Sequence, residues 1–218
     1  MLDNFATILP SVPYILSGAL VTIKFTVVAL MCGLPLGAGL ALAKISENKA
    51  VNRFAAVYTS IFRGTPLLVQ LGLVFWGLPE VIGVRFTTFE AGVLTFSLNS
   101  AAYSSEIIRA GIESIPTGQW EAAQVLGLSY RETFLKIILP QAIRNILPAL
   151  VNETVDLLKE SALVSVIGEP DLLKRAKNVA SENFLYFEPI LMAAAGYYIM
   201  VTIISALAKL LERRLRYA

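Results

Sequence analysis

The chain has 218 residues, of which 56% are hydrophobic and 16% charged, and its mean hydropathy is +0.67. A soluble domain of this size needs more polar surface, so we expect an all-α integral membrane protein with a single domain over residues 1–218. The formal charge of +2 is too small to indicate a nucleic-acid partner. Histidine is absent and Cys32 is the single cysteine, so we expect no catalytic residue and no metal site.

A first membrane span is predicted over residues 14–43. Its residues 25–43 are nineteen consecutive uncharged residues, which cross a ~30 Å hydrocarbon core at 1.5 Å per residue. The preceding segment lacks a basic cluster, so it does not resemble a cleavable signal peptide and is expected to be a short outer segment. Gly33 and Gly37 form a GxxxG pattern, which predicts a face for packing against another helix.

A second span is predicted over residues 54–78, interrupted by the sequence Arg63-Gly64-Thr65-Pro66. The proline removes a backbone donor and leaves a carbonyl free at membrane depth. An arginine at this depth is costly and by default indicates a functional site. The alternative is that Arg63 pairs with a carboxylate of a neighbouring helix for structural reasons.

The third span is predicted over residues 90–112. Asn99, Tyr103 and Glu106 are four and three residues apart, so they share one stripe of this helix. Polar side chains aligned within a bilayer face protein or a cavity. They either bind a solute there or join helices through hydrogen bonds.

A polar segment follows over residues 115–136. Its part EAAQVLG, residues 121–127, predicts a short helix whose small apolar side chains dock into a groove on a partner. Gly127 allows the backbone to turn where the helix ends, and Ser129 with Glu132 fits a capping box for the next helix. The alternative is an ordinary amphipathic helix at the membrane surface.

The fourth span is predicted over residues 137–158, bent by Pro140 and Pro148. One stripe of this helix carries four polar residues, three of them acidic, at Asn152, Glu153, Asp156 and Glu160. Neighbouring carboxylates in a membrane need either cations opposite them or a hydrated chamber. The stripe therefore predicts a chamber for a cationic solute, or else pairing of the carboxylates with Arg63, Arg144 or Lys159.

A mixed polar connector over residues 167–188 leads to a fifth span over residues 189–211. With the N-terminus outside, the cytoplasmic segments carry ten Lys or Arg residues, including Arg213, Arg214 and Arg216, and the outer segments carry four. The positive-inside rule therefore predicts five spans, an outer N-terminus and an inner C-terminus. This orientation places residues 115–136 in the cytoplasm.

Residues 121–140 match, at every signature position, the EAA loop of membrane subunits from ATP-binding-cassette (ABC) importers. Residues 62–70 and 101–120 also resemble permeases for polar amino acids. The resemblance implies the type I ABC importer permease fold, with residues 115–136 as the coupling loop. It implies an ATPase-coupling interface formed by Trp120, Glu121, Ala122, Ala123, Gln124, Leu126 and Gly127.

No G-x-x-x-x-G-K-[ST] motif occurs, so nothing in the chain can bind nucleotide phosphates in that manner. The resemblance implies separate ATPase subunits that bind ATP and Mg²⁺, a second permease subunit that is identical or paralogous, and an extracytoplasmic solute-binding protein. It implies a location in the bacterial cytoplasmic membrane and transport by alternating access, with no cofactor in this chain.

We expect the solute to be a basic amino acid, namely arginine, lysine or histidine, with glutamine or another polar amino acid as the alternative. The residues expected to bind it are Glu153, Asp156, Asn99, Tyr103, Arg63, Thr65, Gln70 and Glu160. An ion channel would also explain polar stripes, but it has no use for a docking helix. An intramembrane enzyme is less favoured, because without histidine it would need Ser/Lys chemistry.

Overall fold

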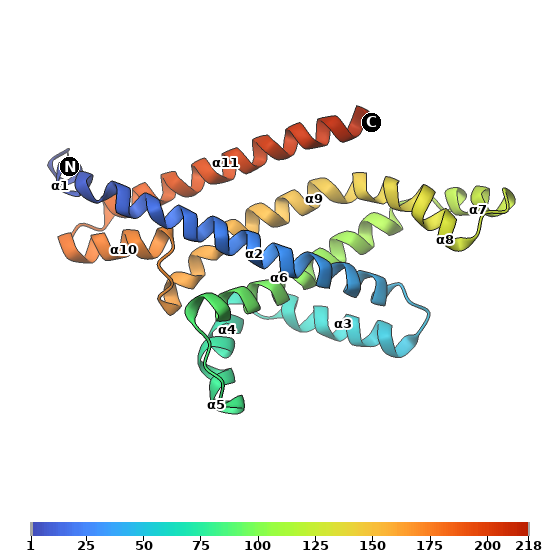
Figure 1. Ribbon diagram of the computed structural model, residues 1–218, viewed down its shortest axis with the longest axis horizontal. Helices are drawn as coiled ribbons and strands as arrows, with labels where there is room; N and C mark the ends of the chain where they lie inside the picture. The colour runs from blue at the N-terminus through green and yellow to red at the C-terminus, as the bar shows by residue number, and fades with distance from the viewer. Residues whose placement is uncertain (1, 218) are drawn as a thin grey trace.

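The computed structural model describes the backbone of residues 2–217 and the side chains of residues 4–210, and every regular element in that part of the chain is helical. The C-terminal arginines that contribute to the charge count have side chains outside the described ones. The α-helices, shown in Figure 1, are α1 (Leu2–Ile8), α2 (Val12–Lys44), α3 (Lys49–Gly64), α4 (Leu67–Gly72), α5 (Leu78–Ile82), α6 (Thr88–Glu113), α7 (Thr117–Val125), α8 (Tyr130–Thr133), α9 (Leu139–Glu160), α10 (Leu172–Asn183) and α11 (Phe187–Tyr217). The all-α prediction is confirmed for these residues.

Two π-helical turns, Leu73–Gly77 and Phe134–Ile138, lead into α5 and α9. In each case the second residue after the turn is a proline, Pro79 or Pro140. A proline cannot donate to the carbonyl four residues before it and its ring crowds that carbonyl, so the wider turn relieves the clash. Short 3-10 turns precede α2 and follow α9, at Leu9–Ser11 and Ser161–Ile167.

The helices α2 and α6 form the most extensive helix pair of the molecule. A Cβ atom on Gly37 would lie 2.8 Å from Cβ of Ser104, and one on Gly33 would lie 3.0 Å from the carbonyl oxygen of Ser97. Only glycine allows so close an approach of the two backbones. The predicted packing face of the GxxxG pattern is therefore confirmed.

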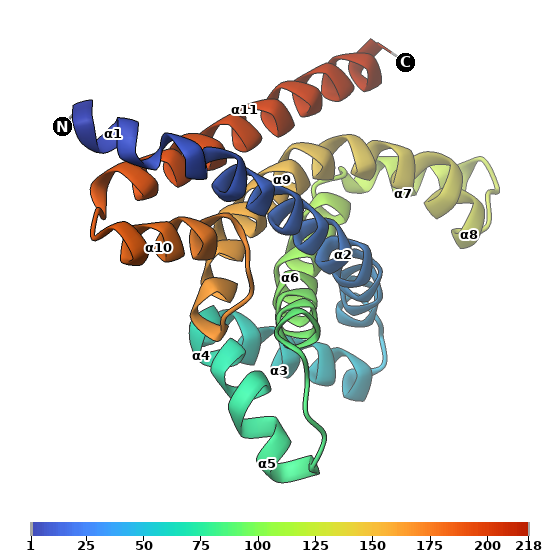
Figure 2. The ribbon, with the colours of Figure 1, turned by 60° about the vertical axis from the view of Figure 1, so that its left-hand side comes forward.

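The apolar run predicted as the second span is divided. The pair of helices Lys49–Gly64 and Leu67–Ile82 bends by 101° at Thr65 and Pro66, and Figure 2 shows α4 and α5 leaving the direction of α3. Three further helices are long and apolar enough to cross a membrane, namely Asn4–Lys44, Tyr130–Ile167 and Phe187–Leu210. The prediction of five spans also requires α6, in which polar residues such as Ser97, Asn99 and Ser104 are buried.

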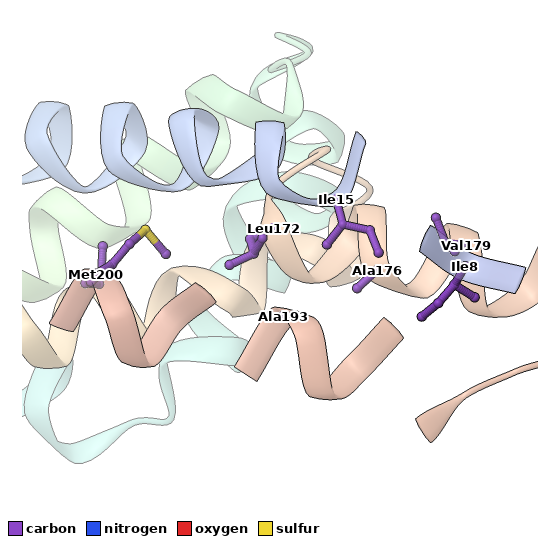
Figure 3. Close-up of a cluster of buried hydrophobic side chains, with 8 residues drawn as sticks. Ile8, Ile15, Leu172, Ala176, Val179, Ala193 and Met200 are labelled. Atoms are coloured by element: carbon purple, nitrogen blue, oxygen red, sulfur yellow. The ribbon is translucent and has the colours of Figure 1, made fainter. Parts of the chain in front are cut away.

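The polar connector before the last span forms α10, an amphipathic helix that packs on α2 and α11. Its apolar face belongs to a buried cluster that includes Ile8, Ile15, Leu172, Val179 and Met200 (Figure 3).

The start of α10 is fixed by Asp171, which caps the helix and accepts hydrogen bonds from the backbone N–H of Lys174 (2.8 Å) and the hydroxyl of Tyr197 (2.9 Å). Burial raises the pKa of the Asp171 carboxyl, and these hydrogen bonds oppose the rise. A Cβ on Gly18 of α2 would lie only 2.7 Å from the Asp171 carbonyl oxygen. Helix α10 is therefore a packed part of the fold rather than a loose connector.

The segments predicted to be cytoplasmic gather at one end of the molecule. The α2–α3 turn, the α7–α8 region and the C-terminal part of α11 lie toward the right of both views, whereas α1 and α10 lie toward the left (Figures 1 and 2). This arrangement is what the predicted orientation requires.

Candidate functional site

A pocket of about 410 Å³ opens between α6, α9 and the turn that follows α9. It is lined by Asn99, Tyr103, Glu153, Asp156, Lys159, Glu160, Ala162 and Leu163. Five of the eight residues expected to bind solute therefore share one pocket. The stripe on α6 and the stripe on α9 face each other across it.

The acidic stripe gives the pocket an excess of negative charge. Asp156 pairs with Lys159, with 2.6 Å between Oδ1 and Nζ, and both side chains are more than half exposed, so the pair is weak. Among the described residues, no ion pair reaches Glu153 or Glu160. Of Arg63, Arg144 and Lys159, the three cations considered as partners for the acidic stripe, Lys159 is thus the one that pairs with it.

The Arg63 guanidinium does not line the pocket. Its Nη1 lies 3.6 Å from Oε1 of Glu106, and its Cζ lies 5.3 Å from the ring centroid of Tyr103. The structural alternative for Arg63, pairing with a carboxylate of a neighbouring helix, is therefore observed. Its partner lies on α6 and not on the acidic stripe of α9.

Glu106 is the centre of a cluster of charges on α2, α3 and α6. Besides Arg63 it pairs with Lys44 and with Arg109, whose Nη2 lies 2.7 Å from Oε2 of Glu106. Arg109 also pairs with Glu113 at 2.6 Å. Arg109 lies three residues after Glu106 on α6, whereas Lys44 and Arg63 come from α2 and α3, so the sequence did not indicate these two cations around Glu106.

Thr65, Gln70 and Asn99 stabilise the break between α3 and α4. Pro66 has no N–H to donate to the carbonyl oxygen of Phe62, and the side-chain amides of Gln70 (2.8 Å) and Asn99 (3.2 Å) donate to it instead. Gln70 also donates to Oγ1 of Thr65 at 2.8 Å, and Asn99 donates to Oε1 of Gln70 at 3.1 Å. Gln70 and Thr65 thus support the backbone and do not line the pocket, whereas Asn99 does both.

The predicted docking helix is α7, and its end has the expected geometry. Gly127 has φ +75°, and its N–H donates to the carbonyl of Gln124 while Leu128 N–H donates to that of Ala123, which together form a Schellman motif. The predicted capping box between Ser129 and Glu132 is also present. These bonds fix the turn between α7 and α8.

Helix α7 presents an apolar surface at its C-terminal end. Val125 is 88% exposed and Leu126 is 77% exposed, whereas the side chain of Ala123 is buried at 1%. Trp120 stacks on Tyr130 of α8, with 5.4 Å between ring centroids. The remaining predicted interface residues, Glu121, Ala122, Gln124 and Gly127, are exposed. Ala123 therefore serves the packing of the loop itself, which the spacing alone did not reveal.

Residues 33–217 match the family model of the binding-protein-dependent transport system inner membrane component. The chain belongs to this family. A Rickettsia bellii protein named as a glutamine transport system permease, GlnP, is 50% identical over 94% of both chains. The arginine transport system permease protein ArtQ of Bacillus subtilis is 46% identical over 98% of this chain and 97% of its own length.

A solved structure described as an amino acid ABC transporter with histidines superposes on this chain with a TM-score of 0.92. It is 44% identical and covers 96% of this chain and 98% of its own. The chain is thus the permease of an amino acid ABC importer, with the ABC permease fold. ATP hydrolysis takes place in a separate subunit, and the family also implies a solute-binding protein as a partner.

Proposed function

We propose that this permease carries a basic amino acid, namely arginine, lysine or histidine, into the bacterial cytoplasm. The observation that carries the proposal is the pocket with three carboxylates and a single ammonium group. A pocket with this charge attracts a cationic side chain and stabilises it where water is partly excluded. A neutral amide gains much less from the same carboxylates.

In the proposed complex, Glu153 and Asp156 pair with the cationic side chain of the solute. Asn99 and Tyr103 hydrogen-bond its polar groups, and Arg63 leaves Glu106 to pair with its carboxylate. In this proposal Thr65 and Gln70 hold the broken helix that carries Arg63. Their hydrogen bonds at the break support this role.

The relatives support an amino acid as the solute but do not agree on which one. The Bacillus subtilis relative is named for arginine, and the solved neighbour is described as an amino acid transporter with histidines. The Rickettsia relative is named for glutamine. The charge of the pocket is what favours a basic amino acid for this chain.

The proposed assembly has two permease subunits, identical or paralogous, two ATPase subunits that bind ATP and Mg²⁺, and an extracytoplasmic solute-binding protein. Each permease spans the cytoplasmic membrane five times, with the N-terminus outside and α7 inside. Closure of the ATPase subunits brings the α7–α8 loops together and opens the pocket outward, and hydrolysis lets the loops separate.

The test is uptake by the intact transport system in cells, with Glu153→Gln as the variant. We expect the affinity for arginine to fall at least about tenfold, or about 1.4 kcal/mol, because a carboxylate that faces the guanidinium is lost. Uptake of glutamine should not fall. The matched control is Glu47→Gln in the exposed α2–α3 turn, which should leave both unchanged. An unchanged affinity for arginine in Glu153→Gln would refute the charge assignment.

Glutamine is the second candidate, because Lys159 neutralises Asp156 and a relative with 50% identity is named for this solute. In that case the wild-type system takes up glutamine in preference to arginine. The substitution Lys159→Gln would then increase arginine uptake, since it leaves Asp156 without its partner.

A further inference from the structure

A second hollow, of about 560 Å³, lies between α6 and α9 on the side nearer to α7. Its polar lining consists of Glu106 from α6, Ser114 directly after the end of α6, and Asn145 from α9. Asn145 Nδ2 donates to Oγ of Ser114 at 2.9 Å. Two small side chains, Ala110 and Ala149, leave it open. We call it the inner hollow.

The inner hollow continues the solute pocket along the same two helix faces. On α6, Glu106 and Ala110 follow Tyr103 at intervals of three and four residues, which keeps them on one stripe. On α9, Ala149 lies one turn before Glu153. The two hollows therefore follow one another along the α6–α9 pair, in the direction of the α6 end that leads into α7. We call the two hollows together the groove.

The two hollows differ in charge. The solute pocket has three carboxylates and one ammonium group. The inner hollow has the carboxylate of Glu106, which is already paired with Lys44, Arg63 and Arg109. A cationic side chain that the solute pocket attracts therefore finds no free carboxylate in the lining of the inner hollow.

Arg63 lines neither hollow but contacts one lining residue of each: its Cζ lies 5.3 Å from the ring centroid of Tyr103, and its Nη1 lies 3.6 Å from Oε1 of Glu106. Its side chain is 45% exposed, and it has the longest of the three contacts with Glu106. Because Lys44 and Arg109 stay on Glu106, Arg63 can leave without stranding a carboxylate. Its guanidinium can then pair with a carboxylate that enters the groove.

We infer that the inner hollow is a second solute site, an exit site of low affinity that holds the amino acid by its α-carboxylate through Arg63 and not by its side chain. The inference rests on the proposed solute pocket as the preceding site. The solute moves from a section that recognises its side chain to a section that ignores it, and the lack of a free carboxylate there favours release to the cytoplasm.

The experiment fills the inner hollow in the intact transport complex by Ala149→Phe or Ala110→Phe. We expect the Kd for arginine, measured on the purified complex, to stay within about twofold, because the solute pocket is untouched. Uptake should fall about tenfold or more for arginine and glutamine alike, because the filled groove adds a barrier common to both. Wild-type uptake by a filled variant would overturn the inference. The control, Ala195→Phe on an exposed face of α11, should transport normally.

A reversible version keeps the test decisive if the phenylalanine variants do not assemble. In a Cys32→Ser background, Ala149→Cys is blocked with a large thiol-specific methanethiosulfonate reagent and released with a reductant, so one folded sample is its own control. Loss of uptake after labelling and its recovery after reduction support the exit site. Unchanged uptake by fully labelled protein overturns it. Failure of the proposed solute assignment shows separately, as an unchanged arginine affinity in Glu153→Gln.

Discussion

At the scale of residues, Pro66 shapes the site because it has no backbone N–H. The carbonyl of Phe62 loses its helical partner, and the amides of Gln70 and Asn99 replace it. An unpaired carbonyl inside a membrane protein is costly, so these side chains make the 101° break a stable feature. Asn99 also lines the solute pocket, and Arg63 precedes the break, so the bend positions two groups of the site.

We expect Gln70→Leu to destabilise the permease by about 1–2 kcal/mol, because Phe62 keeps a single, longer hydrogen bond and Asn99 loses an acceptor. Thermal unfolding of the purified complex measures the effect. Thr65→Val is the matched control, since Gln70 then still reaches the carbonyls of Phe62 and Thr65. Equal losses in the two variants would show that the hydrogen bond to Phe62 is not what stabilises the break.

The sequence was sufficient to group most of the residues that line the pocket of α6 and α9, because helical periodicity fixes which residues share a face. Asn99 with Tyr103, and Glu153 with Asp156, were recognised in this way, and the packing of α6 on α9 brings them together. The partner of Arg63 was not predicted, because a contact between α3 and α6 depends on how helices pack. From the sequence alone, any carboxylate at a similar depth in the membrane could have been the partner of Arg63.

At the scale of elements, the α7–α8 loop is a preformed unit. The Schellman turn at Gly127 and the capping box at Ser129 fix its two helix ends, and the stack of Trp120 on Tyr130 joins them. The apolar side chains of Val125 and Leu126 stay exposed. An apolar knob on a rigid base is suited to transmit force, since a flexible loop would absorb the movement of the ATPase subunits.

We expect Gly127→Ala to weaken the association of ATPase subunits with the permease. A Cβ here meets no atom within 4 Å, but φ +75° costs a non-glycine residue roughly 1–2 kcal/mol, so the strain acts on the backbone of the turn alone. The yield of ATPase that co-purifies with the permease is the measurement. Gly118→Ala is the control, because this glycine also has open space and lies in α7 without a positive φ. Equal yields for the two variants would contradict a role for the turn.

The elements also show where sequence patterns were insufficient. The C-terminal end of α7 and the capping box follow from residue chemistry that acts over four or five positions, and both were predicted, whereas the start of α7 at Thr117 was not. Helix α10 was not recognised, because its polar face dominated the composition of residues 167–188. The burial of its apolar residues, such as Leu172 and Val179, depends on the faces of α2 and α11 that they cover, so it could not be predicted from the segment alone.

At the scale of the whole molecule, the permease has two distinct ends. The basic turn between α2 and α3, the α7–α8 loop and the last part of α11 lie toward one end, and α1 with α10 lies toward the other (Figures 1 and 2). The α6–α9 pair, which lines both hollows, extends between these ends. A push on α7 therefore acts on the helix pair that forms the groove.

The most direct test of the proposed mechanism is the position of α7 on the cytoplasmic side, against the ATPase. In a Cys32→Ser background, Leu126→Cys on α7 and Phe184→Cys at the end of α10 each place one thiol on an exposed position. With a membrane-impermeant maleimide on right-side-out spheroplasts, we predict labelling of Phe184→Cys at once, and of Leu126→Cys only after permeabilisation, together with a cross-link from Leu126→Cys to the ATPase subunit. Labelling of Leu126→Cys from outside, or the absence of any cross-link to a nucleotide-hydrolysing subunit in the assembled complex, would contradict the mechanism.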